Sequence, residues 1–137
     1  MQSLAVIASG GTTNALIQVL TVLMAAVHAD LRVRVLFRDE SVLRLRRGRM
    51  NEPIWSNAFR SDADALAQRM KKLDLTDLEK LCRDIKASGD VKYYVCSSSL
   101  ALCGLKKEDL IDCIDEVRGV PSFLLEDVGA ADKVLTF

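Results

Sequence analysis

Short apolar runs along the chain alternate with longer segments whose apolar residues have helical spacing. Residues 3–9 (SLAVIAS) are almost wholly apolar and stop at a glycine pair, as a strand buried on both faces does. Residues 31–37 (LRVRVLF) alternate apolar residues with arginine, which predicts a strand with one more exposed face. Residues 91–95 (VKYYV) and 133–137 (KVLTF) predict two further strands.

Helices are expected between these strands. Thr12 or Thr13 can cap a helix that runs to about Ala29, and residues 76–79 (TDLE) have the pattern of a capping box. Further helices are expected at residues 40–48, from 61 through 73, from 76 to just before Gly89, and at 97–103, 106–117 and 121 to about 129. Residues 49–60 have no apolar period and are expected to form a loop.

This alternation of strands and helices predicts a mostly parallel sheet with helices on both faces. The chain has 137 residues, of which 50% are hydrophobic and 28% charged, so it is long enough for one real core and too short for two. We therefore expect one α/β domain, a three-layer sandwich that spans residues 1–137.

The charge balance excludes one class of function. Lys+Arg and Asp+Glu both number 19, so the chain lacks the overall positive charge of a protein that binds nucleic acid electrostatically. The charge is nevertheless uneven, because residues 32–49 are rich in arginine and residues 106–127 are rich in Asp and Glu. This pattern fits two alternatives. One is two solvated surfaces that favour self-association, and the other is an arginine-bearing rim over Arg32–Arg49 that attracts an anion or an acidic partner.

One segment has the composition of a membrane helix but not its length. Residues 15–29 are strongly apolar, yet they include Gln18 and Thr21 and are too few to cross ~30 Å of hydrocarbon. We expect a helix buried in a core or a subunit interface and no stable membrane insertion. The N-terminus has no basic region of a secretory signal, which indicates a cytoplasmic protein.

The cysteines do not have the spacing of a metal site. Cys82, Cys96, Cys103 and Cys113 include no C-x-x-C pair, and His28 is the only histidine, so no metal site is expected. In a cytoplasm all four should be reduced thiols. Cys82 and Cys113 occupy apolar positions of expected helices, which is typical of core cysteines.

Cys96 has the surroundings of a reactive thiol. It lies where a parallel strand ends and a helix begins, and ligands bind at that carboxyl edge in open α/β sheets. A helix N-terminus lowers a cysteine pKa below the ~8.5 of the free thiol. The small residues Ser97, Ser98 and Ser99 let backbone amides and hydroxyls approach an anion. The alternative is a small buried thiol at the strand end with Ser97 as a plain helix cap.

Cys103 follows seven residues later, ~10 Å further along a helix. We expect it on the same side as Cys96 but deeper. It is either a core cysteine or a second sulfur acceptor, and the separation is too long for a strain-free disulfide unless the helix moves.

The stretch SGGTTN, from Ser9 to Asn14, is a second candidate site. A glycine pair between a strand and a helix can cradle a phosphate, which makes Gly10, Gly11 and Thr12 candidate anion-binding residues. The stretch lacks the lysine of a P-loop and the third glycine of a dinucleotide fingerprint, so a tight strand-to-helix turn is the alternative.

The order of these pieces resembles the DsrE/DsrF-like sulfur-relay family over nearly the whole chain. The most specific part is YYVCSSSLALCGLKKEDLID, a strand that ends in a cysteine, then a small-residue helix, a glycine and a charged segment. The resemblance implies a flavodoxin-like sheet, oligomers such as trimers or hexamers, and a persulfide carried on Cys96. It also implies protein partners, namely a TusA-like sulfur carrier or a rhodanese-type donor.

Three functions from different classes follow. The first is a sulfur-relay protein that accepts sulfane sulfur or thiosulfate as a persulfide or S-sulfonate on Cys96 and needs no cofactor. The second is a flavin- or nucleotide-binding module that uses the Ser9–Asn14 loop. The third is a non-catalytic oligomeric subunit of the same family.

Overall fold

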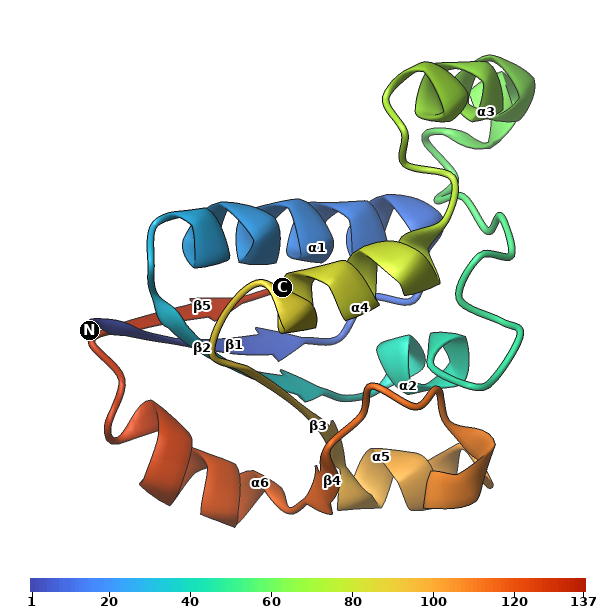
Figure 1. Cartoon of the computed structure of the whole chain (residues 1–137). Coiled ribbons are helices and arrows are strands. Elements are labelled where there is room, and N and C mark those ends of the chain that lie inside the picture. The colour runs from blue at the N-terminus through green and yellow to red at the C-terminus, as the bar shows by residue number, and fades with distance from the viewer.

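A computed structural model describes residues 1–137 and contains a five-stranded sheet with helices on both faces (Figure 1). The strands are β1 (Ser3–Ala8), β2 (Arg32–Phe37), β3 (Val91–Cys96), β4 (Glu116–Arg118) and β5 (Lys133–Thr136). Their order is β4-β3-β2-β1-β5, and every neighbouring pair is parallel. The predicted three-layer α/β fold is confirmed.

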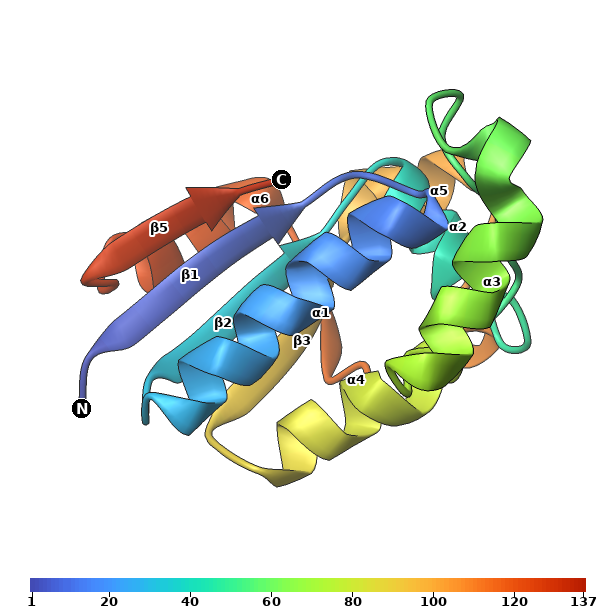
Figure 2. The ribbon, with the colours of Figure 1, turned by 90° about the horizontal axis from the view of Figure 1, so that it is seen from above.

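The helices form two layers and a group at the carboxyl edge of the sheet. One face is covered by α1 (Thr13–His28) and α4 (Leu78–Ala87), and the other by α6 (Val120–Ser122) with its continuation η3 (Phe123–Val128) (Figures 1 and 2). The remaining elements are α2 (Glu40–Arg44), η1 (Arg60–Asp62), α3 (Ala63–Lys72), α5 (Ser97–Leu102) and η2 (Lys107–Asp109). In Figure 1, α2 and α5 follow the ends of β2 and β3.

The sheet divides the interior into a large and a small core. Successive side chains of a strand point to opposite faces, so Tyr93 and Val95 of β3 join a cluster of 25 buried residues with α1 and α4. Tyr94 and Cys96 point the other way, into a cluster of 5 buried residues that includes Phe123. Cys96 is thus a core residue of the smaller, thinly covered face.

The expected helix over residues 106–117 is wrong. The segment forms the short turn η2, an isolated bridge between Arg46 and Leu110, and then strand β4. β3 would otherwise present unpaired N–H and C=O groups at the edge of the sheet, and β4 pairs with it from Tyr94–Glu116 to Cys96–Arg118. The apolar residues Leu110, Ile111 and Ile114, which suggested a helix, are buried from the irregular segment between η2 and β4 instead.

Two other helices differ from expectation in position or packing. The cap of α4 is Asp77 rather than Thr76, because the Asp77 carboxylate accepts the N–H of Lys80 at 3.0 Å. α3 forms as expected but stands away from both helix layers (Figures 1 and 2), and none of its residues is buried. Its apolar face, which ends near Leu73, therefore does not dock on the core.

The arginines of residues 32–49 do not form one rim. Arg32 and Arg34 pair with Asp90, next to the amino end of β3. Arg44 is buried and donates hydrogen bonds to the carbonyls of Gly11 at 2.7 Å and Met50 at 3.0 Å, and also to that of Glu52. The arginine-rich stretch thus includes a core residue that joins the β1–α1 turn to the loop after α2.

α1 contains residues 15–28 of the apolar segment 15–29, and its buried residues include Leu16, Leu20 and Leu23. None of the helices has both the length and the apolar character needed to cross a bilayer.

Candidate functional site

Cys96 ends β3 at the carboxyl edge of the sheet. β2 and β4 flank β3, with Phe37 beside Val95 and Arg118 beside Cys96. The backbone of Cys96 is still extended, and α5 begins at the next residue. The thiol therefore occupies the position at which parallel α/β sheets hold their ligands.

Hydrogen-bond donors surround the Cys96 sulfur. The Sγ atom lies 3.2 Å from the hydroxyl of Ser98. Burial raises the pKa of Cys96, but the hydroxyl of Ser98, together with the backbone N–H groups of Ser98 and Ser99 and the hydroxyl of Ser99, outweighs burial and holds this pKa below its ordinary value. The lowered pKa of Cys96 thus has its cause in these local donors and not in the dipole of a long helix, since α5 has only 6 residues.

A cover of side chains closes this thiol from solvent. Cys96 has an exposed fraction of 0% and shares its cluster with Tyr94 and Phe123. The guanidinium of Arg118 lies 4.1 Å from the centre of the Tyr94 ring and pairs with Asp127 at 2.6 Å. The sulfur therefore has no solvent-exposed surface in this conformation.

The three serines have different roles. Ser97 and Ser98 are exposed, whereas Ser99 is buried and its hydroxyl accepts the N–H of Asp39 at 2.8 Å. Asp39 has a φ of 56°, the left-handed region that residues other than glycine rarely adopt. Ser99 thus fixes a strained turn between β2 and α2. Sequence reasoning missed Asp39 because its conformation depends on this long-range hydrogen bond.

Cys103 lies in a different environment from Cys96. It is partly exposed and packs against the large core, so the expectation of a deeper position on the same side is wrong. It opens into a shallow hollow that Asp39, Glu40 and Leu43 also line. Burial and the Asp39 carboxylate raise the pKa of Cys103, which makes it a weaker nucleophile near neutral pH. The two thiols do not form one site.

The glycines of the β1–α1 turn have a packing role. A Cβ atom on Gly10 would lie 2.6 Å from Cβ of Ala15, and one on Gly11 would lie 2.7 Å from Cβ of Glu40. Both contacts are closer than carbon atoms allow, so only glycine lets α1 and α2 approach the end of β1 this closely.

The polar groups of the same loop are engaged within the chain. The Thr12 hydroxyl accepts the N–H of Ala15, and the side-chain oxygen of Asn14 accepts the N–H of Ser56. Asp39 and Glu40 lie between this loop and Ser99, because the Cβ and carbonyl of Glu40 adjoin Gly11 and the N–H of Asp39 donates to the Ser99 hydroxyl. The structure therefore does not unite Gly10, Gly11 and Thr12 with Cys96 in one anion site, and it favours the tight turn.

Comparisons with known proteins agree with the fold. A family model described as the DsrE/DsrF-like family matches residues 2–137. The YchN protein from E. coli has a similar structure, with a TM-score of 0.64, 19% sequence identity and coverage of 100% of both chains. The protein of unknown function MTH1491 from Methanobacterium thermoautotrophicum has a TM-score of 0.61 and 14% identity, covering 98% of this chain and 99% of its own. No curated protein sequence matches the chain.

Proposed function

This chain belongs to the DsrE/DsrF-like family, which is generally associated with sulfur relay, and on that premise we propose that it carries sulfane sulfur as a persulfide on Cys96. The observation that carries the proposal is the set of donors around the sulfur. The hydroxyl and amide groups of Ser98 and Ser99 hold the pKa of Cys96 down in spite of its burial. The same donors would stabilise the terminal sulfur of a persulfide, which is also an anion.

The transfer needs no acid–base residue beyond the thiolate. The Cys96 thiolate attacks the outer sulfur of a donor persulfide, the donor's S–S bond breaks, and the donor leaves as a thiolate. With thiosulfate as the donor, sulfite leaves instead. An acceptor thiolate then attacks the outer sulfur on Cys96, and Cys96 returns as a thiolate. Each step forms one bond to sulfur and breaks another, so no oxidant or cofactor is consumed.

The cover over Cys96 fits a relay rather than a free reagent. A persulfide on a fully buried sulfur is protected from bulk thiols while it is held. Transfer then requires that the segment with Val120 and Phe123, which packs beside Cys96, be displaced. We propose that docking of the donor or acceptor protein displaces it, and that these partners are a rhodanese-type donor and a TusA-like carrier.

We also propose that the protein works as a homo-oligomer, a trimer or hexamer, in the reducing cytoplasm, where its four free thiols persist. All residues of β5 are exposed at one edge of the sheet. Figure 2 shows β5 beside β1 with no helix above it. Exposed apolar side chains gather along this edge and on η3, namely Leu124, Leu125, Val134, Leu135 and Phe137. Such an apolar edge is typical of a surface between subunits.

Intact-protein mass spectrometry tests the assignment of Cys96. The native protein is incubated with polysulfide or with thiosulfate, beside Cys96→Ser and the matched control Cys103→Ser. We expect a gain of about 32 Da per sulfur in the native protein and in Cys103→Ser, and no gain in Cys96→Ser. Retained loading in Cys96→Ser would overturn the assignment. No adduct on any form would leave a non-catalytic oligomeric subunit as the better interpretation.

A further inference from the structure

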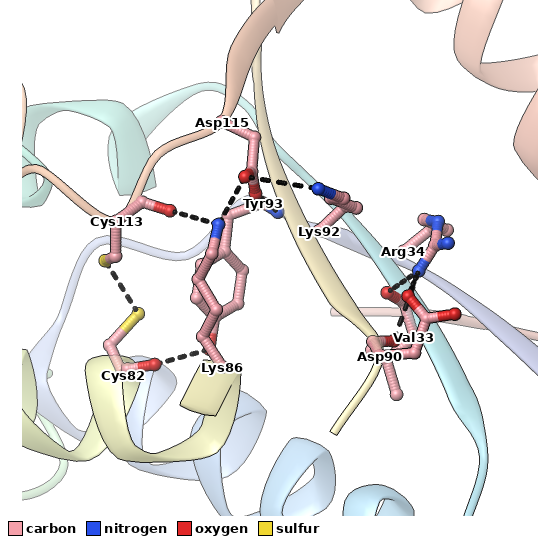
Figure 3. Close-up of polar contacts among 9 residues, drawn as sticks. All are labelled: Val33, Arg34, Cys82, Lys86, Asp90, Lys92, Tyr93, Cys113 and Asp115. Atoms are coloured by element: carbon pink, nitrogen blue, oxygen red, sulfur yellow. Dashed lines mark hydrogen bonds and ion pairs between the residues drawn. The ribbon is translucent and has the colours of Figure 1, made fainter. Parts of the chain in front are cut away.

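Two cysteines outside the proposed site face each other within the large core. Cys82 lies in the middle of α4, and Cys113 lies in the segment between η2 and β4 (Figure 3). Their Sγ atoms are 3.8 Å apart, although 31 residues separate them in the sequence. Both are free thiols. Cys113 does not lie on a helix, so its sulfur can shift without breaking helical hydrogen bonds.

A polar network holds the two cysteines in place. The ammonium group of Lys86 donates to the backbone carbonyl of Cys113 at 3.0 Å and pairs with Asp115. Asp115 accepts the backbone N–H of Tyr93 at 2.8 Å, and the Tyr93 hydroxyl donates to the carbonyl of Cys82 at 2.8 Å. Figure 3 shows the Lys86 side chain extending from α4 to the Cys113 carbonyl and to Asp115. The network attaches the segment of Cys113 and Asp115 to Lys86 of α4 and to Tyr93 of β3, and it attaches the Cys82 carbonyl to Tyr93 as well.

The two thiols differ in acidity. The hydrogen bond with Cys82 and the nearby Lys86 ammonium hold the pKa of Cys113 below its ordinary value. The same contact and burial raise the pKa of Cys82. Cys113 is therefore the thiol that ionises first, and Cys82 keeps its proton.

A small pocket borders Cys113. It has a volume of about 70 Å³, and its lining residues are Arg47, Glu79, Arg83, Ile111, Asp112 and Cys113. Its charged groups form two ion pairs, Arg47–Asp112 at 2.7 Å and Arg83–Glu79 at 2.9 Å, so the walls carry no net charge. A pocket of this volume has room for a small uncharged molecule several times the size of water, and its paired walls give no attraction to an anion.

We propose that Cys113 and Cys82 are a peroxide-reactive pair that closes to a reversible disulfide. The Cys113 thiolate attacks one oxygen of hydrogen peroxide, the O–O bond breaks, and hydroxide leaves and is protonated to water. The resulting sulfenic acid is attacked by the sulfur of Cys82, which loses its proton, and a second water leaves as the S–S bond forms. Two thiols are oxidised and one peroxide is reduced to two waters. This site is independent of Cys96.

The geometry requires a modest movement. A disulfide has an S–S length of about 2.05 Å, so the two sulfurs must approach by about 1.8 Å from their separation of 3.8 Å. Movement of the segment that holds Cys113 supplies this approach, while Lys86 keeps it attached to α4.

The test uses the full chain, reduced and then treated with hydrogen peroxide before free thiols are blocked. The background is a Cys96→Ser/Cys103→Ser variant, in which only the proposed pair remains. We expect a loss of about 2 Da, a cross-linked peptide that contains Cys82 and Cys113, and full reversal by dithiothreitol. The same variant in denaturant is the reference, and the folded protein should close its disulfide at least tenfold faster. Equal rates in the two states would overturn the proposal.

Two single substitutions on this background separate the roles. With Cys82→Ser, Cys113 should accumulate a sulfenic acid that dimedone traps when it is added together with denaturant after the peroxide. With Cys113→Ser, Cys82 should stay reduced. Absence of the dimedone adduct in Cys82→Ser, or direct oxidation of Cys82 in Cys113→Ser, contradicts the proposed order. Oxidised glutathione, a charged oxidant larger than the pocket, should oxidise the thiol pair more slowly than peroxide at equal concentration. If glutathione oxidised the pair faster than peroxide, entry of the oxidant through this pocket would be excluded.

Discussion

The two faces of the sheet each hold a buried cysteine whose pKa is lowered, but the neighbours of the two sulfurs differ. Cys96 is surrounded by the hydroxyl and amide groups of Ser98 and Ser99. Cys113 faces the thiol of Cys82 at 3.8 Å. Hydroxyl and amide donors stabilise a sulfur anion by hydrogen bonds but cannot form a covalent bond to it. A second thiol can form such a bond, a disulfide. The first environment suits the holding of a sulfur atom, and the second suits closure to a disulfide.

The covers of the two sulfurs differ as well. The small cluster over Cys96 has 5 buried residues, and the core that contains Cys113 has 25. Cys96 is fully buried under the small cluster, while Cys113 borders a small pocket. A large partner protein can drive the first kind of access, and a small molecule is enough for the second.

The largest expected effect comes from removal of the cover over Cys96. Phe123 is fully buried in the small cluster, so Phe123→Ala should lower the free energy of unfolding by about 3–5 kcal/mol. It should also speed alkylation of Cys96 more than tenfold, as mass spectrometry of alkylated peptides would show. Leu20→Ala is the matched control, because Leu20 is equally buried in the large core. If Leu20→Ala speeds alkylation of Cys96 just as much, global unfolding and not the cover controls access.

Removal of the hydroxyl nearest to Cys96 should have the next largest effect. Ser98→Ala deletes a hydrogen bond to the thiolate, which is the main contribution that lowers the pKa of Cys96. The midpoint of the pH–rate profile for alkylation of Cys96 should rise by about one unit, since a hydrogen bond to a charged group is worth about 1.5 kcal/mol or more. Ser97→Ala is the control, because Ser97 makes no hydrogen bond to the sulfur. An unchanged midpoint in Ser98→Ala would show that the backbone amides alone set this pKa.

Lys86→Gln tests the cation beside the thiol pair. Without the ammonium group, the pKa of Cys113 should rise, and oxidation by peroxide at neutral pH should slow by about threefold. Cys96 should load sulfur at its normal rate, because it lies on the other face of the sheet. Lys80→Gln on the exposed side of α4 is the matched control. An equal effect in both variants would assign the change to α4 as a whole.

The smallest expected effect concerns the two thiols at the ends of α5. The pKa of Cys96 is lowered and that of Cys103 is raised, so as pH increases Cys96 should gain thiolate reactivity before Cys103. Asp39→Asn removes the nearby carboxylate and should lower the Cys103 midpoint slightly, because burial is the larger cause. Alkylation of each cysteine as a function of pH measures both midpoints. A Cys103 midpoint at or below that of Cys96 would contradict this order.

Most of the fold could be predicted from the sequence because it depends on local patterns. Hydrophobic period and short-range signals predicted four of the five strands, the turn after α5 at Gly104, and a cap of α1 at Thr12 or Thr13, of which the structure uses Thr12. β4 could not be predicted, because its three residues have no period and become a strand only where β3 offers an open edge. For the same reason, the sequence pattern wrongly predicted that Cys113 lies on a helix.

The candidate site was predictable only in part, for the same reason. A strand that ends in a cysteine before small residues placed Cys96 at the carboxyl edge of the sheet, since that position follows from chain order in any parallel α/β fold. The sequence could not show that Phe123 covers this thiol, that Ser99 holds Asp39, or that Cys82 and Cys113 meet across 31 residues. Those contacts join elements far apart in the chain, and only the packing of helices onto the two faces of the sheet brings them together.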